Sequence, residues 1–458
     1  MTSDDKPSAY SAPTEAATLT TEDLSRMSSE FEATPHNRLM QNAVATTTVD
    51  SVALDRAIVT SIDRTVSNLL TDRAVTNQEK SGRCWLFAGT NLLRTGIAQK
   101  LGVKDFELSQ NHLLFWDKLE KANHFLEAII EMRAREDDDR TVAHLLSDPI
   151  GDGGQWNMFV ALVDKHGLVP KSAMPETESS SNTHAMNRSL CRLLRKTARD
   201  MRAQAAAGDD VEQLRKTKDI AVSAAHRILT IHLGTPPTEF FWQWTDDDKG
   251  FHRDGTITPQ QFAKSYLSIP LDEYVCVVHD PRDTSPRGRI YTVQYLGNVV
   301  GAPSVTYLNV EIDQLRDLAQ QAIVGGEPVW FGCDTGKMSN GEHGIWDAGL
   351  YDYDGVYATE LGMTKADRLV YHDSLMTHAM LFIGVDVVDG SPRKWRVENS
   401  WGDERGDKGL WTMNDNWFSE HVFEIAVRRG ALSPQLQAAL DSEPTVLPAW
   451  DPMGALAR

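Results

Sequence analysis

The chain of 458 residues carries 46 basic and 65 acidic side chains, which gives a formal net charge of −19. This charge repels polyanions and disfavours nucleic acid as a partner. Hydrophobic residues make up 41% of the sequence without a run long enough to span a bilayer, and the acidic beginning, Met1 to Lys6, lacks the layout of a secretory signal. We therefore expect a soluble, cytoplasmic globular protein without a membrane partner.

The cysteines and histidines give no sign of a metal centre. Four cysteines in a chain of this length fit a reducing compartment. None of them is spaced as a CxxC pair, and neither His343 nor His372 has metal-site spacing, so we expect no metal and no cofactor. Cys191, Cys276 and Cys333 have apolar neighbours, which is typical of packed core residues.

The N-terminal part changes from a polar tail to a buried helix. Residues 1–18 are rich in Ser, Thr, Ala, Asp and Pro without periodicity, so we expect them to be disordered. Short helices are expected near residues 22–27 and 37–44. The apolar residues that follow position 84 recur too densely for one face alone, which predicts a helix buried on most sides from Cys84 to about Gly102.

Cys84, in the first turn of that helix, is the candidate nucleophile. The positive end of the helix dipole and the unpaired amide hydrogens favour a thiolate, so we expect a lowered pKa for its thiol. Gln78 precedes it closely enough for its side-chain amide to join the Cys84 backbone amide in donating to a developing oxyanion. Gly82 lets the loop approach without a side chain in the way. A lone cysteine is more often a buried apolar residue, so this interpretation needs further partners.

A second helix and a glycine pair follow. The helix is predicted from a cap at Ser109 to Glu131. Taken by itself, the pair Gly153-Gly154 is most simply a tight turn. The alternative is bare backbone on which the main chain of a peptide could pair.

The segment from about residue 176 to 250 has a different composition from its surroundings. It is rich in Ala, Arg, Leu, Lys and Gln and poor in β-branched residues, which predicts an inserted helical module. An aromatic cluster over residues 234–244 forms its tip. We favour core packing for this cluster over an exposed contact surface.

Short apolar segments with Gly and Pro turns predict a barrel-like half over residues 251–431. One helix is expected at about 312–323, ending at Gly325-Gly326. The strands are expected at 274–278, 291–295, 305–308, 328–333, 380–385, 394–397 and 422–427.

Two segments of this half supply partners for Cys84. His378 enters an apolar run typical of a buried strand, and Asn399 ends another strand shortly before Trp401. In a thiol mechanism the histidine accepts the thiol proton and later gives it to the leaving amine, while the asparagine orients the ring. Trp401 would shield the hydrogen bond between His378 and Asn399 from water.

The tail after Leu432 carries four prolines, which we expect to keep it extended. Its last residues, Gly454 to Arg458, are small or apolar before the terminal charge. On residue pattern alone this tail is a flexible chain end.

Six segments, in chain order, resemble a known family: Ser81-Gly82-Arg83-Cys84-Trp85, Gly151-Asp152-Gly153-Gly154-Gln155-Trp156, Trp330-Phe331-Gly332-Cys333-Asp334, Met376-Thr377-His378-Ala379-Met380, Val397-Glu398-Asn399-Ser400-Trp401-Gly402 and the tail from Leu447 to Arg458. They are similar to the papain-like cysteine peptidases, and more closely to the branch of bleomycin hydrolases and bacterial aminopeptidases C. The distance between Cys84 and His378 is roughly twice the about 130–150 residues of simpler papain-like enzymes, as an insertion would produce.

This resemblance implies an α+β papain-like fold with a helical half, a β-barrel-like half, a large helical insertion and a C-terminal arm in the cleft. The implied parts are a disordered N-terminus (1–18), the N-terminal region with the helical half (19–175), an inserted oligomerisation module (176–250), the β-rich half (251–431) and the arm (432–458). A ring-shaped homohexamer is also implied.

The resemblance further implies a cysteine aminopeptidase that removes N-terminal residues from peptides with broad specificity. Its catalytic residues would be Cys84, His378, Asn399 and Gln78.

The arm and the glycine pair would bind the substrate. Gly153 and Gly154 would hold its backbone. Ala457 and Arg458 would meet its free amino group, so that the cut falls one residue from the N-terminus.

Two alternatives stay open. The nearer is another Cys-His-Asn chemistry, as in an endopeptidase or an acyl-transfer enzyme. The farther is a non-catalytic or nucleic-acid-binding oligomer, which the intact set of residues and the acidic charge disfavour. The residues do not decide whether the bleomycin carboxamide is hydrolysed, or whether the enzyme removes its own Arg458.

Overall fold

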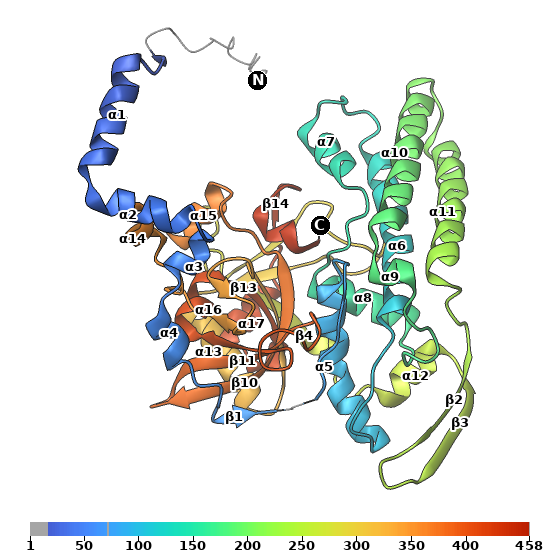
Figure 1. Cartoon of the computed structure of the whole chain (residues 1–458). Coiled ribbons are helices and arrows are strands. Elements are labelled where there is room, and N and C mark those ends of the chain that lie inside the picture. Colours follow the sequence, from blue (N-terminus) through green and yellow to red (C-terminus); the bar gives the residue numbers. More distant parts are fainter. Residues whose placement is uncertain (1–16, 71–72, 458) are drawn as a thin grey trace. The chain divides into compact units, whose positions relative to one another are not determined.

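The computed structural model describes residues 17–70 and 73–457, which form two compact units (Figure 1). Of the described residues, one unit joins 17–56 with 351–362, and the other holds 57–70, 73–350 and 363–457. Except for its last two residues, the disordered tail expected over residues 1–18 lies outside the described residues. The five-part division expected from the sequence stays a prediction.

The first unit is helical. Its helices are α1 (Thr21–Ala33), α2 (Pro35–Val44), α3 (Val49–Ala53) and α14 (Tyr353–Tyr357). The first of them begins with a capping box, in which the Thr20 hydroxyl accepts from the Asp23 amide and the Asp23 carboxylate accepts from the Thr20 amide. The helices predicted near residues 22–27 and 37–44 are thus confirmed.

The helical half of the second unit surrounds one buried helix. Its helices are α5 (Cys84–Leu101), α6 (Gln110–Glu131), α7 (Arg140–Ser147), α8 (Trp156–His166) and α12 (Pro259–Tyr266), preceded by α4 (Arg56–Ser61), which begins at the unit boundary, and the short strand β1 (Asn68–Leu69). As predicted, α5 ends at Gly102, which has the left-handed φ of 68° that favours glycine, and the Ser109 hydroxyl caps α6.

The inserted segment is helical only in its first part. It contains α9 (Glu178–Ser181), α10 (His184–Ala206) and α11 (Val211–Leu233), followed by a hairpin of β2 (Phe240–Thr245) and β3 (Phe251–Ile257). The purely helical expectation is therefore wrong for the aromatic cluster. Trp242 is buried against Phe262 while Phe241 is 59% exposed, because successive residues of a strand face opposite sides. The aromatic cluster therefore contributes both to the core, through Trp242, and to the exposed surface, through Phe241.

The β-rich half is one mixed sheet of twelve strands. Besides β1 it contains β4 (Tyr274–Val278), β5 (Arg289–Val293), β6 (Tyr307–Asn309), β7 (Val329–Cys333), β8 (Ser339–Asn340), β9 (Ile345–Trp346), β10 (His378–Val388), β11 (Ser391–Glu398), β12 (Leu410–Asn414), β13 (Val422–Arg428) and β14 (Thr445–Leu447). Their order is β14-β5-β6-β4-β13-β7-β10-β11-β12-β9-β8, and β1 pairs with β10. All seven expected strands are present within a few residues. No pairing joins β14 to β8 within the described residues, so the sheet is not a closed barrel.

Helices cover the sheet and join it to the helical half. They are α13 (Ile312–Val324), capped at Gly325 as expected, α15 (Lys365–Val370), α16 (Asp415–His421) and the one-turn helices η2 (Leu271–Glu273) and η3 (Arg429–Ala431). Helix α5 packs on β10, and the indole of Trp330 in β7 donates to the Trp85 carbonyl over 3.3 Å. The nucleophile helix is therefore fixed directly on the strand that begins with His378.

The C-terminal arm, residues 432–457, is more ordered than its sequence suggests. It consists of α17 (Pro434–Leu440), β14, which pairs in parallel with β5, and the 3₁₀ helix η4 (Pro452–Ala457). The expectation of a flexible, extended tail is wrong, because Pro434 occupies the first turn of a helix, where its missing N–H costs nothing. Within the described ranges, no helix is long and apolar enough to cross a membrane.

Candidate active site

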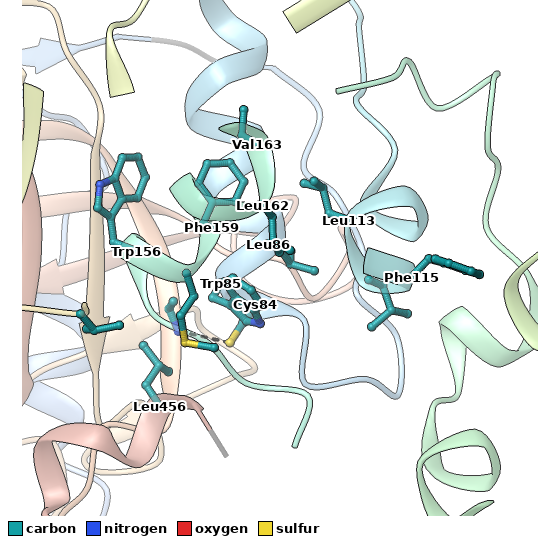
Figure 2. Close-up of a cluster of buried hydrophobic side chains, with 14 of the residues drawn as sticks. Cys84, Trp85, Leu86, Leu113, Phe115, Trp156, Phe159, Leu162, Val163 and Leu456 are labelled. Carbon is teal, nitrogen blue, oxygen red and sulfur yellow. Dashed lines mark hydrogen bonds between the residues drawn. The ribbon is translucent and has the colours of Figure 1, made fainter. Parts of the chain in front are cut away.

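Cys84 is the first residue of α5 and is only 4% exposed. Its Sγ accepts a hydrogen bond from the Ala379 amide over 3.4 Å. The residue before Ala379 is His378, so the structure brings the candidate nucleophile and the candidate base together. Figure 2 shows Cys84 among apolar side chains of α5 and α8.

His378 and Asn399 lie on neighbouring strands. The histidine opens β10, and the asparagine directly follows β11, which runs antiparallel beside it. His378 Nε2 lies 2.9 Å from Asn399 Oδ1, and the ring centroid of Trp401 lies 4.8 Å from that of the imidazole. With Nε2 engaged by the asparagine, Nδ1 is the ring nitrogen that can serve the thiol.

Gln78 is held by a residue that sequence reasoning did not single out. Its backbone amide donates to the Ser400 carbonyl over 2.8 Å, and the Ser400 hydroxyl donates to its Oε1 over 2.7 Å. Because Oε1 is fixed in this way, the amide nitrogen must face the opposite direction, where it donates to the Ser81 carbonyl. The only available signal was the position of Ser400 between Asn399 and Trp401.

The glycine pair is buried and closely packed. A Cβ at Gly154 would lie 2.4 Å from the ring of Trp85, so no larger residue fits there. The Gly153 carbonyl accepts from the ammonium group of Lys121. The pair lies in irregular backbone rather than in a tight turn, which removes the simplest interpretation of the sequence and leaves the substrate role as a prediction.

Asp152 fixes the loop that carries Gln78 and Cys84. Its carboxylate accepts from the Gly82 amide over 3.0 Å and pairs with Lys118, 2.6 Å away on α6. This ammonium group and further hydrogen bonds from Thr183 and Asn187 outweigh burial and hold the pKa of Asp152 well below its usual range. The sequence did not predict this role of Asp152. Its partner Lys118 is buried, whereas the pattern of a surface helix places lysine in solvent.

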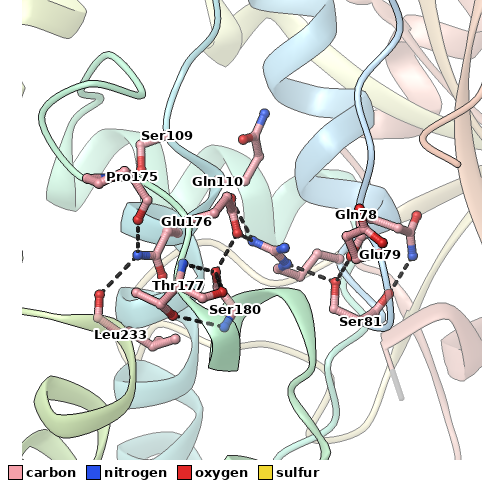
Figure 3. Close-up of polar contacts among 12 residues, drawn as sticks. Gln78, Glu79, Ser81, Ser109, Gln110, Pro175, Glu176, Thr177, Ser180 and Leu233 are labelled. Atoms are coloured by element: carbon pink, nitrogen blue, oxygen red, sulfur yellow. Dashed lines mark hydrogen bonds and ion pairs between the residues drawn. The ribbon is translucent and has the colours of Figure 1, made fainter. Parts of the chain in front are cut away.

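Arg83 links the same loop to the inserted segment. It is fully buried, donates to the Ser81 hydroxyl and contacts both carboxylate oxygens of Glu176 over 2.9 and 3.0 Å. Figure 3 shows the resulting chain of contacts from Gln78 through Ser81 to Glu176 and Ser180. The start of the insertion thus stabilises the loop on which the candidate oxyanion donor lies.

Burial dominates the titration of the candidate catalytic pair. It raises the pKa of the Cys84 thiol to about 11, even though the amides of Ala379, Trp85 and Cys84 itself oppose this shift. It also lowers the pKa of His378 to about 4. The expected lowering of the thiol pKa is therefore wrong for this covered site, since desolvation outweighs the helix terminus. A neutral thiol faces a neutral imidazole.

The pH dependence follows from these two values. At pH values between these two pKa values, Cys84 and His378 together hold one proton, which is on the thiol. Below about pH 4 the imidazole is protonated as well, so that His378 cannot accept the thiol proton. We expect the acid limb of kcat/KM near pH 4. The measurement is a pH–rate profile on a small amide substrate. An acid limb at about 6.5, the ordinary value for histidine, would contradict this environment.

The end of the arm lies against β7, next to the strand that begins with His378. A Cβ at Gly332 would lie 2.5 Å from Met376 Sδ and 3.4 Å from Leu456 Cδ2, and Gly332 pairs in register with Ala379. Leu456 is 3% exposed and belongs to the same buried cluster as Cys84 (Figure 2). The end of the arm therefore packs on β7, the neighbour of the strand that begins with His378.

The predicted contacts at the very end of the arm are only partly described. Ala457 lines a cavity of about 90 Å³ together with Lys121 and Tyr295, and Arg458 lies outside the described residues.

The remaining candidates stay outside the site. Cys276 and Cys333 are buried as expected, whereas Cys191 is half-buried and packs against the core cluster, so its assignment to the core holds only in part. His372 is exposed in a loop. No group of three or more metal-binding side chains occurs in the part of the chain that the structure describes.

A buried helix that presents a thiol to a sheet carrying a histidine and an asparagine is the arrangement of a papain-like cysteine peptidase. A sequence model of the Peptidase C1-like family matches residues 18–454, and the chain belongs to this family.

The known relatives cover nearly the whole chain. Bleomycin hydrolase of Mus musculus is 40% identical over 452 residues, which are 96% of this chain and 99% of the relative. Aminopeptidase C of Streptococcus thermophilus is 40% identical over 440 residues, with the same two shares. The crystal structure of PepW from Lactobacillus rhamnosis HN001 superposes with a TM-score of 0.94 at 43% identity, over 96% of this chain and 99% of PepW. The superposition with PepW and the family match confirm the papain-like fold expected from the sequence.

Proposed function

We propose that the protein is a cysteine aminopeptidase that removes N-terminal residues from peptides. The observation that carries the proposal is the arm, whose Leu456 is buried against Gly332, next to the strand of the candidate base. Relatives named bleomycin hydrolase and aminopeptidase C, about 40% identical over nearly the full chain, support the same activity.

In the proposed mechanism, Cys84 Sγ attacks the carbonyl carbon of the first peptide bond while its proton passes to His378 Nδ1. The oxyanion accepts hydrogen bonds from the Cys84 amide and the Gln78 side chain. His378 then protonates the leaving amine, and the C–N bond breaks to leave a thioester. Water, deprotonated by His378, attacks the thioester and releases the amino acid and the thiol.

Because the site is buried and its thiol and imidazole are neutral at rest, Asn399 and Gln78 would stabilise the charges that form during the reaction. An imidazolium forms transiently in a site that disfavours charge, and the Asn399 carbonyl, 2.9 Å from Nε2, orients and stabilises it. The Gln78 amide nitrogen must leave the Ser81 carbonyl to reach the oxyanion, while Ser400 keeps its Oε1 fixed.

The arm would act as a ruler. It would fill the cleft on the side where residues upstream of the scissile bond lie, so that a peptide enters with only its first residue beyond the cut. Gly153 and Gly154 would hold the peptide backbone. Ala457 and Arg458 would lie closest to its free amino group.

A pair of substrates that differ only in N-acetylation tests this function. We expect a fluorogenic aminoacyl amide to be cleaved and its N-acetylated twin to resist. Equal cleavage of both would favour an endopeptidase, the nearer alternative. Cleavage of neither would favour a non-catalytic protein.

We also propose that the insertion mediates a homo-oligomer, a hexamer by resemblance to the family, in the reducing cytoplasm that four free cysteines suit. Ile220 and Ile231 of α11 are 74% and 76% exposed, and Phe241 and Phe251 of the hairpin are 59% exposed. A contiguous patch of exposed apolar side chains marks a protein interface, and these four side chains would belong to one.

Ile231→Glu should split this assembly because it places a charge in an apolar contact. Light scattering coupled to size exclusion would report the smaller mass. The matched change Ser391→Glu, at the exposed start of β11 outside the insertion, should leave the mass unchanged. A monomeric wild-type protein would contradict the proposed assembly.

A further inference from the structure

The arm is fastened to the sheet by a buried charge network just before η4. The guanidinium of Arg282 contacts both carboxylate oxygens of Asp451 over 2.9 and 3.1 Å, and on its other edge it contacts both oxygens of Asp280 over 2.7 to 3.2 Å. The side chains of Arg282, Asp280 and Asp451 are 11%, 4% and 6% exposed. Two facing bidentate contacts fix both position and angle of the guanidinium.

Asp451 also shapes the chain that follows it. Its carboxylate accepts from the Met453 amide over 3.0 Å, and its backbone carbonyl accepts from the Gly454 amide over 3.0 Å. The side chain that reaches Arg282 therefore also begins the 3₁₀ helix η4, which carries Leu456. A shift of Asp451 would move η4 as a whole.

The Met453 carbonyl makes a second attachment, between the two halves. The hydroxyl of Tyr307 in β6 donates to it over 3.2 Å, and the side-chain amide of Gln155, at the start of α8, donates over 3.5 Å. Both bonds are buried. They set the register of the arm relative to the glycine pair, which directly precedes Gln155.

We propose that the network of Asp280, Arg282 and Asp451 is the positioning device that sets how deeply the arm enters the cleft. It would thereby restrict the enzyme to substrates with a free N-terminus. Asp451 and Arg282 touch no reacting atom and act through η4. This inference rests on the proposed aminopeptidase function, and it adds which contacts keep the ruler in place.

The physical reason is the cost of a mismatched buried partner. If Asp451 loses its charge, Asp280 still neutralises Arg282, so the ion pair between Arg282 and Asp280 remains. The arm loses its bidentate attachment, and an amide NH₂ at position 451 would face the guanidinium donors. The arm should therefore detach while the rest of the sheet remains intact.

The experiment compares Asp451→Asn with Asp441→Asn in the full-length chain. Asp441 lies in the same arm, but its partner Arg429 and its own side chain are exposed, so the control makes the same chemical change without a buried contact. For each variant, kcat and KM are measured on an aminoacyl amide and on its N-acetylated twin. A chain truncated before Gly454 serves as the reference for a missing ruler.

We expect Asp451→Asn to raise the ratio of blocked to free-amine cleavage by about tenfold or more, equivalent to about 1.4 kcal/mol. Asp441→Asn should leave the ratio within about twofold of wild type. A gain of cleavage on blocked substrates is a result that misfolding or a merely structural role would not produce. Thermal unfolding of each variant provides the check on folding.

The outcomes separate this inference from the function on which it rests. An unchanged ratio in Asp451→Asn, with a raised ratio in the truncated chain, would overturn the positioning role and leave the aminopeptidase function standing. Equal cleavage of both substrates by wild type would overturn the function itself. If Asp451→Asn does not fold, Arg282→Lys keeps the charge but loses the bidentate contact, and the same ratio decides.

Discussion

Replacing Cys84 by alanine should lower kcat/KM on an aminoacyl amide by a factor on the order of 10⁴ or more, as removal of a catalytic nucleophile does elsewhere. The side chain has no structural substitute, because the attack on the carbonyl carbon needs its sulfur. The loss should appear in kcat, while substrate binding changes little. The measurement is steady-state kinetics together with thermal unfolding.

Cys191→Ala is the matched control for this experiment. Cys191 lies in α10, is half-buried and bonds neither Cys84 nor His378, so its replacement should leave kcat/KM within about twofold. Activity of Cys84→Ala above a tenth of wild type would show that another group performs the attack. The thiol mechanism would then have to be abandoned.

Truncation of the chain before Gly454 should open the cleft to blocked peptides. Removal of Leu456 takes a side chain away from the bare backbone of Gly332, so peptide residues upstream of the cut should gain room. We expect cleavage of an N-acetylated peptide to rise about 100-fold, a difference of about 2.7 kcal/mol. The assay is kcat/KM on the blocked substrate for both chains.

The cost of this truncation in stability should be modest. Burial of one leucine contributes about 1.5–3 kcal/mol, which a unit of this size tolerates. Leu456→Ala, which keeps the arm but removes its apolar contact, should have an intermediate effect on blocked peptides. No gain on blocked peptides in either variant would show that the arm does not limit the substrate.

The main elements of the catalytic core follow from local sequence pattern. The dense apolar run after Cys84 predicted α5 to its final glycine, and the run after His378 predicted the core of β10, because both elements are buried on nearly all sides. The β2–β3 hairpin was missed, since adjacent aromatic residues obscure the alternation by which Trp242 faces the core and Phe241 the solvent.

Contacts between distant residues could not be predicted in this way. Ser400 meets Gln78 across 322 positions, and Lys118 meets Asp152 through a helix face that pattern alone assigns to solvent. The pKa of Cys84 had the wrong expected sign for the same reason. The burial that raises it comes with packing against segments far away in the chain, such as β10, whereas the sequence displays only the neighbouring helix terminus.

Cleavage of one aminoacyl amide and its N-acetylated twin by the wild-type protein tests the central claim most directly, because both substrates share the scissile bond and differ only in the free amino group. The aminopeptidase function predicts that the acetylated twin is cleaved at least about 100-fold less efficiently, a gap of about 2.7 kcal/mol. Equal kcat/KM values for the two substrates would contradict it.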